Sequence, residues 1–228
     1  MKKILALCLV VLTACNSKPK TPFHVLKSVK KKDGAKLDVQ VNSRLSKQEM
    51  IDIAAYLKKD SSQYNNLQVD FILPGNSYEN KGGIVVYATA AYHDKSIVSP
   101  ADTVSDKDKN FLSFEFMGFT PEKAKQLLAL DPQELTGKQL LGKFIDDGTK
   151  TISMIAEDKH ENNQLYILEL DSAGKVVSAI APMEVTVKGI RKMVVSQQGD
   201  YMVLKDSILT MYSSTDYDKP FRSIKQNL

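Results

Sequence analysis

Residues 140–170 read LLGKFIDDGTKTISMIAEDKHENNQLYILEL, a series of short apolar runs separated by polar turns. Asp147-Gly148 follows the first run and is a dipeptide typical of turns. Runs of this length, bounded by turn residues, are typical of strands rather than of helices. This stretch therefore predicts an antiparallel sheet in the second half of the chain.

The same pattern continues to the C-terminus, where Asp171-Ser172-Ala173-Gly174 and Gly199-Asp200 supply further turn signals. Short strands at near-regular spacing are typical of antiparallel barrels and sandwiches. We therefore expect an all-β lobe over residues 134–228, barrel or sandwich-like, that needs no helix and is long enough to fold alone. The expected strands are Leu140–Ile145, Thr151–Ala156, Gln164–Leu170, Val176–Ala181, Glu184–Lys188, Lys192–Val195, Tyr201–Leu204, Ile208–Tyr212 and Phe221–Ile224.

A helix start stands out in the first half of the chain. Ser46 and Glu49 have the S-x-x-E spacing of a capping box, and Leu45 and Met50 have the spacing of a hydrophobic staple. Apolar residues then recur at helical spacing, which predicts a helix over about Lys47–Lys58.

The rest of the first half alternates between strand and helix patterns. Thr120-Pro121 is typical of a helix cap followed by proline at the first helical position, and Asp131-Pro132 is a stop signal. The fold class is therefore α+β, with an N-terminal lobe of strands and two helices over residues 36–133. The other expected elements are strands at Leu37–Val41, Leu67–Leu73, Ile84–Tyr92 and Phe111–Phe119, a loop over 93–110, and a helix from Pro121 to about Leu130.

The N-terminus has the pattern of a secretory signal. Lys2 and Lys3 precede a short apolar run, which ends in Leu12-Thr13-Ala14-Cys15. These four residues resemble the lipobox of bacterial lipoproteins; the alternative is an ordinary secretory signal that happens to contain a cysteine. The resemblance implies that residues 1–14 are cleaved and that Cys15 is lipidated.

Residues 15–35 are expected to form a lipid-anchored basic tether. Asn16 follows the cysteine, and the resemblance implies retention at the outer membrane, facing the periplasm, because an aspartate there marks inner-membrane lipoproteins. Lys27 and Lys30–Lys32 either contact anionic headgroups or form an ordinary solvated helix or loop.

A second, looser resemblance lies in the body of the chain. Ile72-Leu73-Pro74-Gly75, Val85-Val86-Tyr87-Ala88 and the stretch from Gly142-Lys143-Phe144 to Gly199-Asp200-Tyr201 look similar to a pattern found in small envelope lipoproteins. It implies no activity.

Composition excludes several kinds of chemistry. Removal of residues 1–14 takes Lys2 and Lys3 away and leaves 29 basic side chains against 27 acidic ones, so the charge gives no argument for a nucleic-acid partner. Cys8 leaves with the signal and Cys15 is consumed by lipid, which excludes cysteine nucleophiles, redox pairs and thiolate metal sites. No cofactor is predicted.

Motif searches find no catalytic constellation. His24, His93 and His160 lack the i, i+4 pairing of a zinc helix. Asp106, Asp108 and Asn110 begin like a calcium loop, but Phe111 stands where glycine is needed, so a solvated acidic loop is favoured. Asp146 and Asp147 are adjacent and point to opposite faces in a strand, so we expect a turn there rather than a carboxylate pair.

Function is therefore expected to be non-catalytic, as a membrane-anchored envelope protein that binds another protein or a small ligand or has a structural role. The alternatives are a periplasmic inhibitor or immunity-type protein, and a periplasmic hydrolase without a recognisable motif. Loops on a rigid sheet commonly carry recognition. The candidate contact residues lie on two loops and are Pro74, Gly75, Tyr78, His93, Asp102, Asp106 and Asp108.

Overall fold

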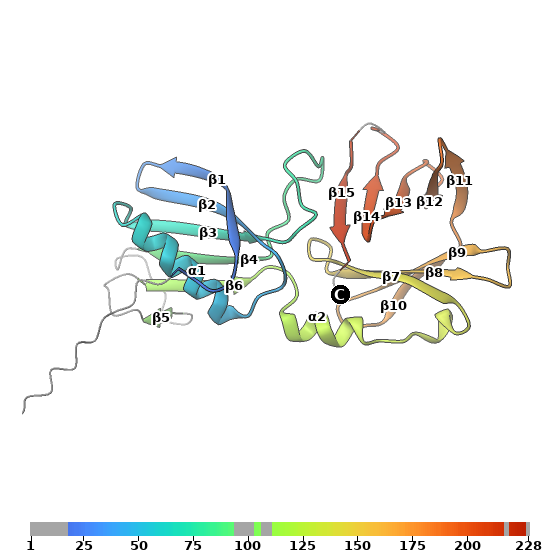
Figure 1. Cartoon of the computed structure of the whole chain (residues 1–228), viewed down its shortest axis with the longest axis horizontal. Helices are drawn as coiled ribbons and strands as arrows, with labels where there is room; N and C mark the ends of the chain where they lie inside the picture. The colour runs from blue at the N-terminus through green and yellow to red at the C-terminus, as the bar shows by residue number, and fades with distance from the viewer. Residues whose placement is uncertain (1–17, 94–102, 106–110, 217–218, 227–228) are drawn as a thin grey trace, which may run out of the picture.

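The computed structural model describes residues 18–93, 103–105, 111–216 and 219–226, and these form three sheets with two α-helices (Figure 1). The six-stranded sheet belongs to the first half of the chain, and the four-stranded and five-stranded sheets belong to the second half. The expected strand-rich, sandwich-like second half is confirmed. Strands make up a larger share of the chain than they would in an even mixture of helices and strands.

The six-stranded sheet, called sheet A below, has the order β1-β2-β3-β4-β6-β5. Among the strands that the structure describes in this sheet, only β2 and β3 are parallel, because the helix α1 crosses over between them. Alternate residues of the central strands face α1 and form one apolar core with it. The strands are β1 (Phe23–Lys31), β2 (Gly34–Val41), β3 (Asn66–Ile72), β4 (Ala88–His93), β5 (Thr103–Ser105) and β6 (Phe111–Phe116).

Helix α1 (Lys47–Asp60) begins where the sequence predicts and runs slightly further. Glu49 N donates to Ser46 Oγ at 3.3 Å, and Ser46 N donates to Glu49 Oε2 at 2.9 Å, so the capping box is complete. Ser46 Oγ also donates to Glu49 Oε2 at 2.7 Å, and this bond, followed by the one from Ser46 N, holds the pKa of Glu49 below its ordinary value. Local sequence is sufficient for this helix because the cap and the apolar stripe lie within it.

We predict that Ser46→Ala lowers the free energy of unfolding by about 0.5–2 kcal/mol, the usual loss for a helix cap. Denaturant unfolding of a form beginning at Asn16, which retains every described residue, measures it. Ser62→Ala, the same change at an exposed position after the helix, is the matched control. Equal midpoints for the two variants would contradict the prediction.

The second half forms two antiparallel sheets that pack face to face. All nine predicted strands are present. The sandwich-like alternative is correct, and neither sheet closes into a barrel among the described residues. Sheet B, in the order β10-β9-β8-β7, contains β7 (Gln139–Asp146), β8 (Thr151–Asp158), β9 (Gln164–Leu170) and β10 (Val176–Ile180). Sheet C, in chain order, contains β11 (Met183–Val187), β12 (Ile190–Val194), β13 (Tyr201–Lys205), β14 (Ile208–Tyr212) and β15 (Arg222–Lys225).

Both faces of sheet B are covered. Phe144, Ile155 and Ile167 face sheet C, whereas Ile152 and Met154 belong to a separate core on the other face. Fully covered strands carry apolar residues without polar alternation, as the run Ile152–Ala156 largely does.

The cover on that other face is α2 (Pro121–Leu128), followed by the short 3-10 helix η2 (Gln133–Leu135). Ala124, Leu127 and Leu135 are buried in this core. The prediction that α2 belongs to an N-terminal lobe ending at residue 133 is therefore wrong in its packing. The prediction that the second half needs no helix is also wrong. Sheet B has two apolar faces, and sheet C can cover only one of them.

The predicted tether over residues 15–35 is also wrong in its second part. Phe23–Lys31 form β1, which pairs along its length with β2. Every β1 side chain after Phe23 is exposed, and the register shifts between Val25 and Lys27. These two features remove the apolar alternation by which a strand is recognised in a sequence.

Candidate functional site

The structure places four of the predicted contact residues, Pro74, Gly75, Tyr78 and His93. Asp102, Asp106 and Asp108 lie outside the described residues, as does Cys15. The four described residues fall into two groups, one at the junction between the halves of the chain and one on sheet A.

Pro74 and Gly75 contact the second half of the chain. Gly75 has φ +96°, and a Cβ atom there would lie 3.0 Å from Lys225 N and 3.1 Å from Ser223 O in β15. The same connection donates backbone hydrogen bonds from Lys81 N to Pro220 O at 3.0 Å and from Gly82 N to Phe221 O at 2.9 Å. This loop is therefore a bridge within the chain, contrary to the expectation that Pro74 and Gly75 form an open contact surface.

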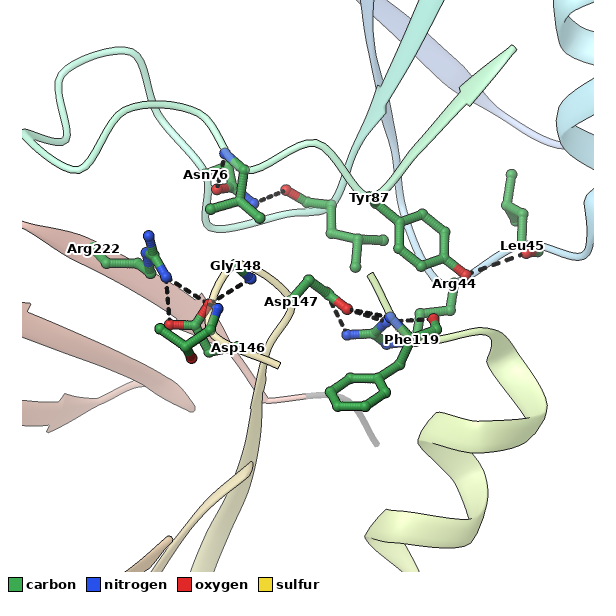
Figure 2. A network of polar contacts seen from close by, with 12 residues as sticks. Arg44, Leu45, Asn76, Tyr87, Phe119, Asp146, Asp147, Gly148 and Arg222 are labelled. Carbon is green, nitrogen blue, oxygen red and sulfur yellow. Dashed lines mark hydrogen bonds and ion pairs between the residues drawn. The ribbon is translucent and has the colours of Figure 1, made fainter. Parts of the chain in front are cut away.

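A buried ion pair joins the two halves at the same junction (Figure 2). Arg44, between β2 and α1, donates from Nη1 to Asp147 Oδ1 at 2.8 Å and from Nη2 to Oδ2 at 2.6 Å. Arg44 Nη1 also donates to Phe119 O at 3.0 Å, and Phe119 N donates to Asp147 Oδ1 at 2.9 Å. The side chains of Arg44 and Asp147 are only 8% and 7% exposed, so water screens this pair weakly.

Asp146 turns away from Asp147 and binds a different arginine, as Figure 2 shows. Arg222 Nη1 lies 2.6 Å and 2.5 Å from the two oxygens of Asp146, and Gly148 N donates to Asp146 Oδ1 at 2.8 Å. The expectation that the two carboxylates do not converge is confirmed. Arg44 and Arg222 were not found by sequence reasoning, because single arginines far from their partners give no local signal.

The junction has the properties of a structural joint. Its cavity, lined by both arginines and both aspartates, holds about 20 Å³. Small-molecule sites commonly enclose some 300–1,000 Å³, so this cavity is too small for one. Each carboxylate there is engaged by a guanidinium group, which leaves neither as an obvious general base.

The face of sheet A opposite α1 is the better candidate site. We call it the polar face and define it by Lys36, Asp38, Gln68, Asp70, Thr89, His93 and Ser113. These residues alternate along β2, β3, β4 and β6 with the apolar residues that face α1.

Asp70 is the centre of the polar face and is only 3% exposed. Lys36 Nζ lies 2.7 Å from Asp70 Oδ2, while Gln68 Nε2 and Thr89 Oγ1 each donate to Oδ1 at 2.9 Å. The hydrogen bond with Asp70 raises the pKa of Lys36, with desolvation opposing it. The Asp70 carboxylate therefore holds three polar side chains in fixed positions. Such a network favours recognition of a ligand through hydrogen bonds over proton transfer.

Tyr78 reaches this face from the Pro74–Gly83 connection. Its hydroxyl donates to Asp38 Oδ2, and Lys27 Nζ lies 5.1 Å from the centre of its ring. Tyr78 as a whole is 48% exposed, so it can contact another molecule while the hydroxyl is held. Desolvation, together with the hydrogen bond to Asp38, raises the pKa of Tyr78 to about 12.

We predict that alkaline pH destabilises the fold partly through Tyr78. Because its folded pKa is raised, the native state keeps this proton while the unfolded chain loses it, so stability is present below about pH 10. It is lost as pH rises towards 12, the folded value. Denaturant midpoints measured at several pH values in this window should fall less steeply for Tyr78→Phe than for the wild type; identical slopes would contradict it.

His93 lies at the end of the same face. Its Nε2 atom is 2.9 Å from Ser113 Oγ on the neighbouring strand β6. Beside it is a hollow of about 410 Å³, lined in part by Lys31, Lys32 and Gln68. This volume is in the range of small-molecule sites. Its lining is mixed, because Asp33 and the apolar residues Ala35 and Leu67 lie beside the two lysines.

The part of the chain that the structure describes holds neither a metal-binding cluster nor a membrane-spanning helix. No group of three or more His, Cys, Asp or Glu side chains there could hold a metal ion. No helix there is long and apolar enough to cross a membrane.

Comparison of the chain with protein-family models, with curated proteins and with solved structures finds no significant match.

Proposed function

We propose that the protein is a lipid-anchored envelope protein with a non-catalytic binding role, held at the outer membrane on the periplasmic side through Cys15. The observation that carries the anchoring is Leu12-Thr13-Ala14-Cys15 after a charged, apolar N-terminus. Strand β1 begins at Phe23, so few residues separate the cysteine from the folded part. Residues 16–22 reach at most about 20–25 Å, which keeps the fold close to the membrane.

The polar face of sheet A supports the binding part of the proposal. Its central carboxylate has three partners, whereas Tyr78, which donates to the neighbouring Asp38, is half exposed. A rigid sheet with an exposed aromatic side chain and a hollow of mixed lining is suited to recognition of a small ligand or of another envelope protein.

Cys15→Ser tests the anchoring. The thiol is the atom that receives the lipid in the family that the motif resembles, so we expect the variant to lose incorporation of labelled palmitate and to leave the membrane fraction. Cys8→Ser, within the apolar run, is the control and should incorporate label as the wild type does. Equal label in Cys15→Ser and wild type overturns the proposal.

The binding role is tested by a photo-crosslinking phenylalanine analogue placed at position 78 in cells. An exposed position of α1, Asp52, is the control on the opposite side of sheet A. We expect a discrete crosslinked product at position 78 and none at position 52. Absence of a product at position 78, or the same products at both, contradicts the assignment of the polar face.

A further inference from the structure

The outer edge of sheet A is an exposed strand with an unusual composition. Figure 1 shows β1 at this edge, where it pairs with β2 and with no other described strand. Three of its large apolar side chains are well exposed: Val25 at 45%, Leu26 at 41% and Val29 at 39%. The exposed lysines Lys27, Lys30 and Lys31 lie on the same strand, and Lys32 follows it.

These four lysines carry charge that the fold does not neutralise. Within the part of the chain that the structure describes, none of them has an ion pair. Lys27 Nζ instead lies 5.1 Å from the Tyr78 ring. Exposed Lys18 and Lys20 precede the strand, so positive charge continues towards the N-terminus. The mature chain has a net charge of only +2 in total, with 29 basic and 27 acidic side chains, so this edge is a local concentration of charge.

We propose that β1 lies on the surface of a membrane that contains anionic lipid headgroups. The lysines match the charge of such a surface, and Val25, Leu26 and Val29 can enter the interface between headgroups and acyl chains. Because β1 is an edge strand, side chains from both of its faces reach solvent along one rim and can contact a flat surface together. The inference rests on the proposed anchoring, which brings β1 within a short tether of the bilayer.

Protection of a sheet edge is the other explanation for lysines on an outer strand, since charge there prevents edge-to-edge aggregation. That explanation accounts for the lysines alone. It does not account for three exposed apolar side chains beside them, which would promote aggregation in water. A membrane surface accounts for both.

The test uses the lipid-free form beginning at Asn16, so that it does not depend on lipidation of Cys15. Sedimentation with vesicles of phosphatidylcholine containing phosphatidylglycerol measures binding at low ionic strength. The test variant carries Lys27→Gln, Lys30→Gln, Lys31→Gln and Lys32→Gln. The control carries the same number of Lys→Gln changes at exposed positions of the second half, Lys150, Lys175, Lys188 and Lys205, and therefore has the same net charge.

We expect the vesicle partition coefficient of the test variant to fall at least about tenfold, because each lysine near an anionic surface contributes severalfold to binding. The control should stay within about twofold of the wild type. Binding should also weaken in high salt, which screens surface charge, and should be lost on vesicles of phosphatidylcholine alone. Equal losses in test and control variants, or equal binding to neutral vesicles, overturn the proposal.

A second readout locates the contact. The chain contains no tryptophan, so Leu26→Trp introduces a single reporter on β1. Its emission should shift to the blue with phosphatidylglycerol vesicles, whereas Val177→Trp, at a position 56% exposed on β10, should not shift. Equal shifts at both positions, or none at position 26, contradict contact through β1. Failure here with intact palmitate labelling of Cys15 would reject the β1 contact and leave the anchoring in place.

Discussion

Asp147→Ala is expected to lower the free energy of unfolding by about 3–5 kcal/mol, the loss typical of a buried ion pair deprived of one partner. Arg44 would remain, 8% exposed in its side chain, without the carboxylate that binds it through two hydrogen bonds. Phe119 N would also lose its acceptor. Denaturant unfolding of the form beginning at Asn16 provides the measurement.

A double variant distinguishes the interaction free energy of the Arg44–Asp147 pair from the separate contributions of the two side chains. Arg44→Ala with Asp147→Ala should cost clearly less than the sum of the two single changes, since the second change removes the charge that the first leaves unpaired. Asp131→Ala, at an exposed aspartate between α2 and η2, is the matched control and should change stability by less than about 0.5 kcal/mol. A cost below about 1 kcal/mol for Asp147→Ala would show that the junction does not bury this charge in solution.

Leu127→Ala is expected to lower the free energy of unfolding by about 2–5 kcal/mol, the usual range for truncation of a buried leucine. Leu127 is 2% exposed in the core between α2 and sheet B. Its Cδ2 atom lies 3.5 Å from where a Cβ of Gly174 would stand, so the turn after β9 closes over it. A residue with cover on so many sides leaves a cavity that its neighbours fill poorly.

Hydrogen exchange shows which core the helix belongs to. Leu127→Ala should reduce amide protection in β8 and β9 more than in β3, because its contacts are with sheet B. Gln126→Ala, on the exposed side of α2, should leave both sheets protected. Loss of protection confined to β3 would instead support the placement of α2 with the first half of the chain.

The packing of α2 shows how far the sequence alone can define a lobe. The helix α2 was found from Thr120 and Pro121, because a cap and a proline act on the adjacent turn. Its packing partner was assigned wrongly, because the sequence places it before a stop signal and next to the first half. Independent folding from residue 134 onwards is accordingly disfavoured, since such a fragment lacks the helix that covers sheet B.

The sequence also predicted some residues of the candidate site and missed others. Tyr78 and His93 were singled out from loop positions; His93 lies on the polar face of sheet A, and Tyr78 reaches that face from its loop. Asp38 and Asp70 were not, because a carboxylate on an alternating strand looks like any solvent-facing residue. Their burial comes from neighbouring strands and from the Tyr78 loop, which no local pattern records.

By itself the sequence determined the elements that are defined by neighbouring residues: helix α1 with its capping box, the nine strands of the second half and the turns between them. It also predicts a signal-like N-terminus, which lies outside the described residues. Tertiary structure alone decided the junction of Arg44 with Asp147, the cover of sheet B by α2 and the exposed edge formed by β1. These depend on contacts between residues far apart in the chain, 103 positions for the ion pair, and such contacts form only when the whole chain is packed.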